Sequence, residues 1–354
     1  MESASIPVRP TRRSRGEVAR EYVSRFGLIA ILLILPVAYG IQDLQDDGNL
    51  SRLATNIKDG LSNGAIWALI AVGYTLVYGI IELINFAHGD LFMIGSFVSY
   101  ALIGTVGLTT ATGNFGLLFG LLLILAIAMV GCGTLNVMIE RVGYRPLRNA
   151  PKLAPLITAV GFSFILQNVG LLWLGGAHHG VPDLIESQND FFTVLGVPVT
   201  HGDILALVVT VPLFIFLVTF IARSRMGRAM RATAQDPQAA RLMGINVDTT
   251  ISFTFLTGGL MAGAAGLIYA LYQTDVWFFS GFTAGLIAFT AAVMGGIGNL
   301  KGAILGGLII GCLQQISDNR IGTEWTPVIV FAYLVLILVF RPQGLLGEET
   351  REAG

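Results

Sequence analysis

Residues 61–83 read LSNGAIWALIAVGYTLVYGIIEL, and Glu82 is the only charged residue among them. A helix needs about 20 mostly apolar residues to cross the hydrocarbon core of a bilayer, which is about 30 Å thick. The stretch is long and apolar enough to do so. Its glycines fit the same interpretation, because glycine in membrane helices permits close contact between neighbours. The stretch therefore predicts a transmembrane helix.

The composition of the whole chain agrees with this prediction. Of the 354 residues, 54% are hydrophobic and 12% are charged, whereas soluble domains carry about 25% charged residues. A water-soluble surface cannot be built from so few charges. Cys132 and Cys312 lie inside apolar runs, so neither a disulfide framework nor a cysteine metal site is indicated. The apolar run at 26–41 lacks a following small-residue cleavage pattern and predicts a retained span rather than a signal peptide.

Repetition of such apolar segments predicts an all-α, polytopic membrane protein. The gaps between the segments are mostly short, which favours one compact domain. Ten candidate spans are found, at approximately 26–41, 61–83, 90–108, 115–139, 153–174, 203–222, 250–273, 281–298, 302–316 and 326–340.

The basic residues give an independent test of these spans. If the amino terminus is cytoplasmic and each segment crosses once, all but three of the 21 Lys and Arg residues fall on the cytoplasmic side. The three exceptions are Arg52, Lys58 and Arg320, and the outer loops lean acidic. Membrane proteins show this positive-inside bias. The pattern predicts about ten transmembrane segments with both termini in the cytoplasm.

The long basic connection at 223–245 carries signals for a short helix outside the membrane. Asp236 is a good N-cap, Pro237 suits the first helical position, and Gly244 suits the residue after the last turn. These residues predict a helix at about 237–243. Its small residues, Ala239 and Ala240, suit the groove of a partner protein. A helix held on the membrane surface by lipid phosphates is the alternative, and the basic residues fit both.

Several stretches together resemble a known family. They are 68–80 (ALIAVGYTLVYGI), 84–90 (INFAHGD), 140–147 (ERVGYRPL), 225–228 (RMGR) and 288–298 (AFTAAVMGGIG). The alanines followed by Gly-Ile in the 223–245 loop also resemble the "EAA" loop of ABC importer permeases, whose short helix docks on the ATPase subunit. The chain is similar to the branched-chain amino acid permeases of high-affinity leucine, isoleucine and valine importers, in particular to the first of their two permease types.

The resemblance covers residues from about 57 to the end. It implies an ABC importer permease domain at 57–354, preceded at 1–56 by a basic cytoplasmic amino terminus and an additional first transmembrane helix. It also implies that the loop couples the chain to ATP hydrolysis. The implied coupling residues are Gly227, Arg228, Arg231, Asp236, Pro237, Ala239, Ala240, Arg241 and Gly244.

The same resemblance implies the partners. They are two ATP-binding subunits, a second related permease subunit, an extracytoplasmic substrate-binding protein and the lipid of a prokaryotic cytoplasmic (inner) membrane; no nucleic acid is expected. The sequence contains no G-x-x-x-x-G-K-[ST] phosphate loop, so ATP and Mg are expected on the partner subunits and no cofactor on this chain.

Polar residues within the spans suggest a translocation path, because polar groups at membrane depth are costly and commonly functional. If Gly89 breaks a helix, the next helix start offers free N–H groups to a substrate carboxylate. The alternative, which the predicted topology favours, places this turn at the inner surface with Asp90 as a cap. The candidate path residues are Tyr74, Tyr78, Asn85, His88, Asp90, Ser96, Gln167, Asn168 and Thr290.

Other functions remain open. The cargo of a related permease can be urea, short amides or other amino acids. An ion-coupled secondary transporter is disfavoured by the scarcity of charges in the spans. A membrane metalloenzyme is disfavoured because the histidines His88, His178, His179 and His201 show no H-E-x-x-H or comparable spacing. No catalytic residue and no metal ligand is predicted.

Overall fold

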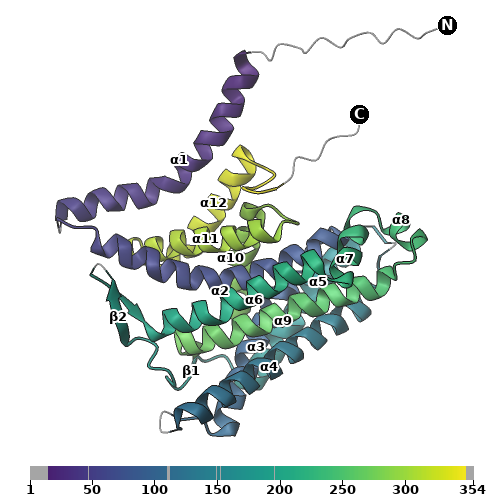
Figure 1. Ribbon diagram of the computed structural model, residues 1–354, viewed down its shortest axis with the longest axis horizontal. Coiled ribbons are helices and arrows are strands. Elements are labelled where there is room, and N and C mark those ends of the chain that lie inside the picture. The colour runs from purple at the N-terminus through teal and green to yellow at the C-terminus, as the bar shows by residue number, and fades with distance from the viewer. Residues whose placement is uncertain are drawn as a thin grey trace.

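The computed structural model describes residues 15–46, 48–109, 112–148, 150–151, 153–194 and 196–347, which form a bundle of helices (Figure 1). The long helices are α1 (Arg15–Asp46), α2 (Ser51–Ile81), α3 (Ala87–Val106), α4 (Asn114–Ile139), α5 (Leu153–Leu174), α6 (His201–Arg223), α9 (Val247–Gln273), α10 (Ser280–Gly295), α11 (Leu300–Arg320) and α12 (Thr326–Phe340). The shorter helices are η1 (Glu140–Tyr144), α7 (Arg225–Gln235), α8 (Pro237–Leu242) and η2 (Thr323–Trp325). Antiparallel strand pairs join β1 (His179–Gly180) to β4 (Asp275–Val276) and β2 (Asp190–Val194) to β3 (Val197–Thr200).

Each of the ten predicted segments corresponds to one of the long helices, so the prediction of a polytopic α-helical membrane protein is confirmed. Among the described residues, eight helices are long and apolar enough to cross a membrane. Helix α10 has 16 residues and is shorter than a full span. The number of crossings and the side on which each terminus lies stay predictions.

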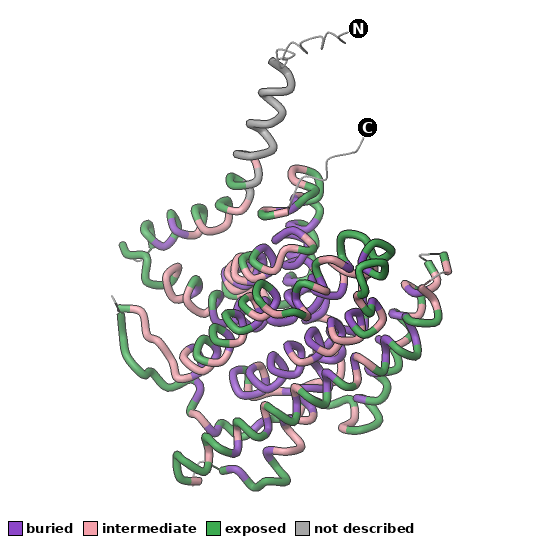
Figure 2. The backbone as a smooth tube through the Cα atoms, turned by 45° about the vertical axis from the view of Figure 1, so that its right-hand side comes forward, coloured by how far each residue is buried: buried purple, intermediate pink, exposed green. Residues whose placement is uncertain are grey.

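The bundle has a buried centre and an apolar periphery. Helices α2 and α9 are buried over most of their length, as the central purple tube in Figure 2 shows. The outer helices α4, α5, α6 and α12 instead expose large apolar side chains, for example Phe115, Leu172, Phe216 and Val339. Apolar residues on this surface are stable only when hydrocarbon or another protein covers them. The arrangement is that of a protein embedded in lipid.

Glycine lets the central helices touch. A Cβ added to Gly311 on α11 would lie 2.3 Å from the Cα of Gly64 on α2, and one added to Gly307 would lie 2.5 Å from the Cα of Ala68. Distances this short leave no room for any side chain. Close backbone approach of this kind is typical of helix contacts in membranes, where lipid is as apolar as the side chains and packing supplies the stability.

The two ends of the bundle carry different segments. Helices α7 and α8 lie at one end, and the β2–β3 hairpin lies at the other (Figure 1). The predicted topology assigns these two segments to opposite sides of the membrane, and their separation agrees with that assignment. Helix α1 is attached near the hairpin end, where the buried Asp43 accepts a hydrogen bond from Arg320 of α11.

Candidate functional site

The loop that follows α6 is folded into α7 and α8. Asp236 lies between them and is the N-cap of α8, because its Oδ1 accepts hydrogen bonds from the backbone N–H of Gln238 (2.8 Å) and Ala239 (3.0 Å). Pro237 takes the first helical position. Gly244 follows the last turn with φ of +82°, a conformation that favours glycine. The predicted helix at 237–243 is confirmed, ending one residue early.

Helix α7 was not predicted, and arginines hold it on the end of α6. Arg231 donates to the carbonyl oxygens of Ile221 and of the residue after it, and Arg228 donates to the last carbonyl of α6 at 3.1 Å. The last carbonyls of a helix lack partners within it, so these bonds complete α6. A Cβ on Gly227 would lie 2.2 Å from the Ile221 oxygen. Three of the expected coupling residues therefore fix the loop to the bundle.

The surface that α8 presents differs from the expected one. Ala240 is buried against the chain, so of the two alanines only Ala239 is presented, and the expected small-residue face is wrong for Ala240. The exposed tip is formed by Leu242 and Met243, which are 89% and 83% exposed, beside the exposed Arg241. An apolar pair next to a cation is a suitable contact for a protein groove with acidic groups at its edge.

A second site lies where the chain turns between α2 and α3. The ring of His88 packs directly against Gly73 of α2 and Gly258 of α9, since a Cβ on Gly73 would lie 2.1 Å from its Nε2. Gly258 is close to the middle of the 27-residue α9. Helix α3 therefore begins deep inside the bundle, and the turn that precedes it runs back from the end of α2. The expectation that His88 and Asp90 lie at the inner surface is wrong.

Helix α10 also begins at this depth, and its start meets the start of α3. A Cβ on Gly281 would lie 2.8 Å from the Cα of Asp90, and one on Gly89 would lie 2.6 Å from the Cα of Gly285. The N-terminus of a helix carries a partial positive charge and free N–H groups. Two such ends face the buried carboxylate of Asp90, which is 1% exposed. Asp90 does not cap α3 by a side-chain hydrogen bond, since the N-cap is Phe86.

Several predicted path residues meet around this carboxylate. Asp90 accepts a hydrogen bond of 2.5 Å from Ser163 of α5, and Ser163 accepts one of 3.1 Å from Gln167. The ring of Tyr74 lies edge-on to His88, with centroids 4.9 Å apart. Tyr74 and Tyr78 also line a small cavity. Its other lining residues are Ile84, Phe289, Ala292 and Ile297.

The remaining candidates lie apart from this cluster. Asn85 donates to Asn136 of α4 at 3.1 Å and accepts from Tyr144 at 3.3 Å, so it ties the turn to a neighbouring helix. The hydroxyls of Ser96 and Thr290 donate to carbonyls of their own helices. The exposed side chain of Asn168 donates to Phe164 of its own helix. Ser163 was missed, although its four-residue spacing from Gln167 is a readable signal.

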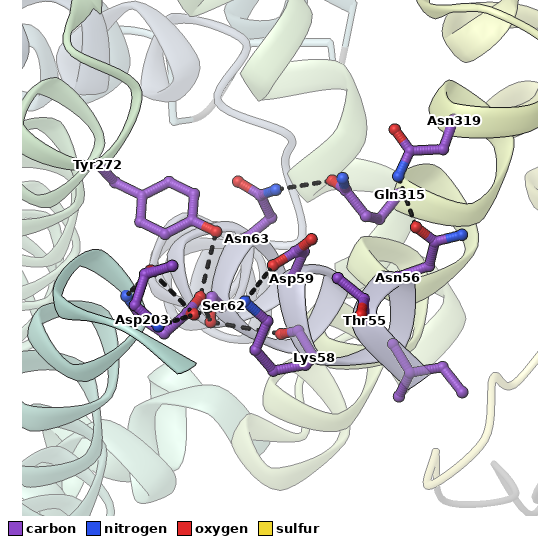
Figure 3. A network of polar contacts seen from close by, with 12 residues as sticks. Thr55, Asn56, Lys58, Asp59, Ser62, Asn63, Asp203, Tyr272, Gln315 and Asn319 are labelled. Carbon is purple, nitrogen blue, oxygen red and sulfur yellow. Dashed lines mark hydrogen bonds and ion pairs between the residues drawn. The ribbon is translucent and has the colours of Figure 1, made fainter. Parts of the chain in front are cut away.

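The hairpin end of the bundle holds a polar network to which Lys58, predicted to lie in a loop, contributes (Figure 3). Helix α2 begins ten residues earlier than predicted, so Lys58 belongs to it. Lys58 Nζ lies 2.7 Å from Asp203 of α6, which also accepts a hydrogen bond from Ser62 at 2.7 Å. Tyr272 of α9 donates to the same carboxyl at 3.3 Å. The buried carboxylate of Asp203 therefore links α2, α6 and α9.

The histidines outside the bundle centre do not form a metal site in the part of the chain that the structure describes. His178 lies 2.7 Å from Asp275, but no group of three potential ligands is found among the described residues. His179 bonds to the carbonyl of Leu174. These contacts connect the loops between helices.

Comparison with known proteins identifies the family. The family model described as "Branched-chain amino acid transport system / permease component" matches residues 56–338. The chain belongs to this family. It is 40% identical over 293 residues to the high-affinity branched-chain amino acid transport system permease protein BraD of Pseudomonas aeruginosa, covering 82% of this chain and 94% of that protein. It is 41% identical over 297 residues to LivH of Escherichia coli K12, with the same coverage. No solved structure matches the chain.

Family membership makes the chain a membrane-embedded permease component of a transport system. A more distant relative, the probable branched-chain amino acid transport permease protein LivH of Methanocaldococcus jannaschii, is 25% identical and covers 80% of this chain. Helix α1 lies before the residues that the family model matches. The coupling loop and the buried cluster at Asp90 both lie within them.

Proposed function

We propose that the chain is the transmembrane permease subunit of an ATP-driven importer that carries leucine, isoleucine and valine into the cytoplasm of a prokaryote. The observation that carries the proposal is the 40% identity to high-affinity branched-chain amino acid permeases over 94% of their length. A match that covers nearly the whole relative includes the bundle, the loop and the central cluster together. The chain itself would perform no chemistry.

The geometry of α8 supports the proposed coupling to ATPase subunits. The helix stands at the end of the bundle and follows α7, which Arg228 and Arg231 hold on α6. It presents Leu242 and Met243 to the surroundings. A short rigid helix with an exposed apolar tip transmits force between two proteins better than a flexible loop does, because little of its motion is lost in bending. ATP and Mg would be bound by two partner subunits and not by this chain.

The other proposed partners follow from the family to which the chain belongs. A second related permease would complete the path, and an extracytoplasmic binding protein would deliver the substrate at the hairpin end. The cluster around Asp90 is too closed for free passage, since His88 and Asp90 are at most 1% exposed. Passage therefore requires α3, α10 or the partner permease to move. In transporters, alternating access is largely a rigid-body movement of one group of helices against another.

A different cargo is the second candidate within the family. The autoinducer 2 import system permease protein LsrC of Escherichia coli O9:H4 is 28% identical over 198 residues, so related chains serve systems with other cargoes. Urea, short amides and other amino acids stay possible cargoes because selectivity can reside in the binding protein.

Uptake of labelled leucine tests the proposal. Membrane vesicles would contain this chain with or without its ATP-binding subunits, partner permease and binding protein. We expect uptake that requires ATP and every partner. Uptake by this chain alone, driven by an ion gradient, would identify a secondary transporter. No leucine uptake by the full assembly, with competition by urea or amides, would move the cargo away from branched-chain amino acids.

A further inference from the structure

Four amide side chains gather between α2, α9 and α11 near the hairpin end. We call them the outer amide cluster, which consists of Asn63, Gln273, Gln314 and Gln315. Asn63 donates to Gln315 at 3.0 Å and accepts from Gln273 at 3.2 Å. Gln314 accepts from the indole N–H of Trp67 at 2.8 Å. Asn63 and Gln315 face each other in Figure 3.

The cluster reaches from the packed helices to the surface at the end of α9. Gln273 is the last residue of α9, and its side chain is exposed. Gln315 of α11 is half-buried, and Asn63 of α2 is buried.

Amides at this position need a polar partner. Gln273 is exposed, and Gln314 and Gln315 are half-buried. Hydrocarbon cannot hydrogen-bond to an amide, so contact with lipid is costly. Water, another protein or a polar ligand must therefore face the cluster. An apolar group lies one helical turn further along α2, where the ring of Trp67, which is 5% exposed, packs on Tyr269 with centroids 6.0 Å apart and on Phe92 at 6.3 Å.

The free hydrogen-bonding groups of the cluster match both ends of a zwitterion. Among the described residues, the amide nitrogen of Gln315 and the carbonyl oxygen of Gln273 make no hydrogen bond. An amide nitrogen donates to a carboxylate, and an amide oxygen accepts from an ammonium group. Lys58 does not compete for the carboxylate, because it is paired with Asp203 and with Asp59 at 2.5 Å. The neutral amides are thus the groups left to contact a ligand.

We propose that the outer amide cluster receives the substrate from the outer side of the transporter. Its amides hold the α-carboxylate and α-ammonium groups of an aliphatic amino acid, while the aliphatic side chain lies toward the partly exposed ring of Tyr269. The proposal rests on the proposed import function and adds the place at which the substrate first contacts this chain. Uncharged amides hold a zwitterion weakly, and weak binding permits onward movement.

The test uses the complete transporter reconstituted with its partners. Gln315→Leu and Gln273→Leu are measured for leucine uptake and for the ATPase activity that the loaded binding protein stimulates. We expect uptake per ATP hydrolysed to fall about tenfold in each variant, the effect of losing one hydrogen bond to a charged group, with stimulated ATPase activity retained. Gln42→Leu, which removes an exposed amide from α1, should leave both unchanged. Unchanged uptake per ATP in both cluster variants would overturn the proposal.

A labelling experiment separates substrate contact from subunit contact. Gln315→Cys is combined with Cys312→Ser, and a membrane-impermeant thiol reagent is applied from the outer side. We expect labelling in the full assembly that leucine-loaded binding protein slows. If position 315 reacts in the isolated chain but not in the full assembly, the partner permease covers the cluster and the proposal fails. If the wild-type transporter imports no leucine, the proposed import function fails. That failure is distinguishable from failure of the amide-cluster proposal because it is seen without any variant.

Discussion

The N-cap of α8 offers the sharpest test of the coupling loop. Asp236→Ala removes the carboxyl oxygen that accepts from Gln238 and Ala239. Loss of an N-cap costs about 1 kcal/mol, within a range of about 0.5–2 kcal/mol. A helix of six residues is not stable alone in water, so the shape of α8 depends on its cap and on its attachment to α7. A change of about 1 kcal/mol alters an equilibrium about fivefold.

We expect the Kd of the ATP-binding subunit for the permease to rise about fivefold in Asp236→Ala. The assay is a titration of labelled ATP-binding subunit against the permease in nanodiscs, with membrane insertion measured separately and expected to be unchanged. Asp236→Asn keeps a good cap and should bind as the wild type does. Gln238→Ala, a change of an exposed neighbour, serves as a matched control.

Two results would refute this reasoning. An unchanged Kd in Asp236→Ala would mean that the shape of α8 does not matter for docking. An equal loss in Asp236→Asn would mean that the charge of Asp236 contacts the partner directly and that capping is not the cause.

Three further predictions concern the bundle. Gly311→Val should prevent α2 and α11 from packing and abolish recovery of folded protein, measured by monodispersity in detergent. Gly131→Ala is the control and should be recovered normally, because nothing lies within 4 Å of the added Cβ. Lys58→Met leaves the buried carboxylate of Asp203 without a cation and should lower the free energy of unfolding by about 1–3 kcal/mol. The loss is smaller than for a fully buried pair because Lys58 is partly exposed. An unchanged thermal midpoint would contradict this prediction. A cysteine replacing Glu186 should react with an impermeant reagent from outside, and one replacing Ala234 only from inside; reversed accessibility would refute the topology.

The sequence predicted the elements that have strong local signals. All ten apolar segments form helices, and α8 was located from Asp236, Pro237 and Gly244 because capping chemistry is local. Helix α7 was missed because its residues are polar and basic. The signals were present, since Ser224 caps it by accepting from Gly227.

The sequence did not reveal how deep within the bundle each helix begins. Hydrophobicity measures whether a segment can cross a membrane, but it does not say where a helix begins relative to its neighbours. The position of Asp90 follows from contacts between glycines on α3, α9 and α10, which are far apart in the chain. The outer amide cluster was missed for the same reason, because its members come from three helices and each amide alone is an ordinary residue.

Several basic residues of the bundle are already paired and are not free to bind the carboxylate of a zwitterion. Lys58 is paired with Asp203, Arg148 with the buried Glu140, and Arg320 with Asp43. Breaking one of these pairs to bind one end of an amino acid would leave the other partner uncompensated, at a cost of about 1–5 kcal/mol that rises with the burial of the pair. Neutral amides and helix N-termini contact the same ligand without that cost. Tight selection of the substrate is therefore better placed in a separate binding protein. The permease needs only a series of weak contacts with the substrate between its two ends.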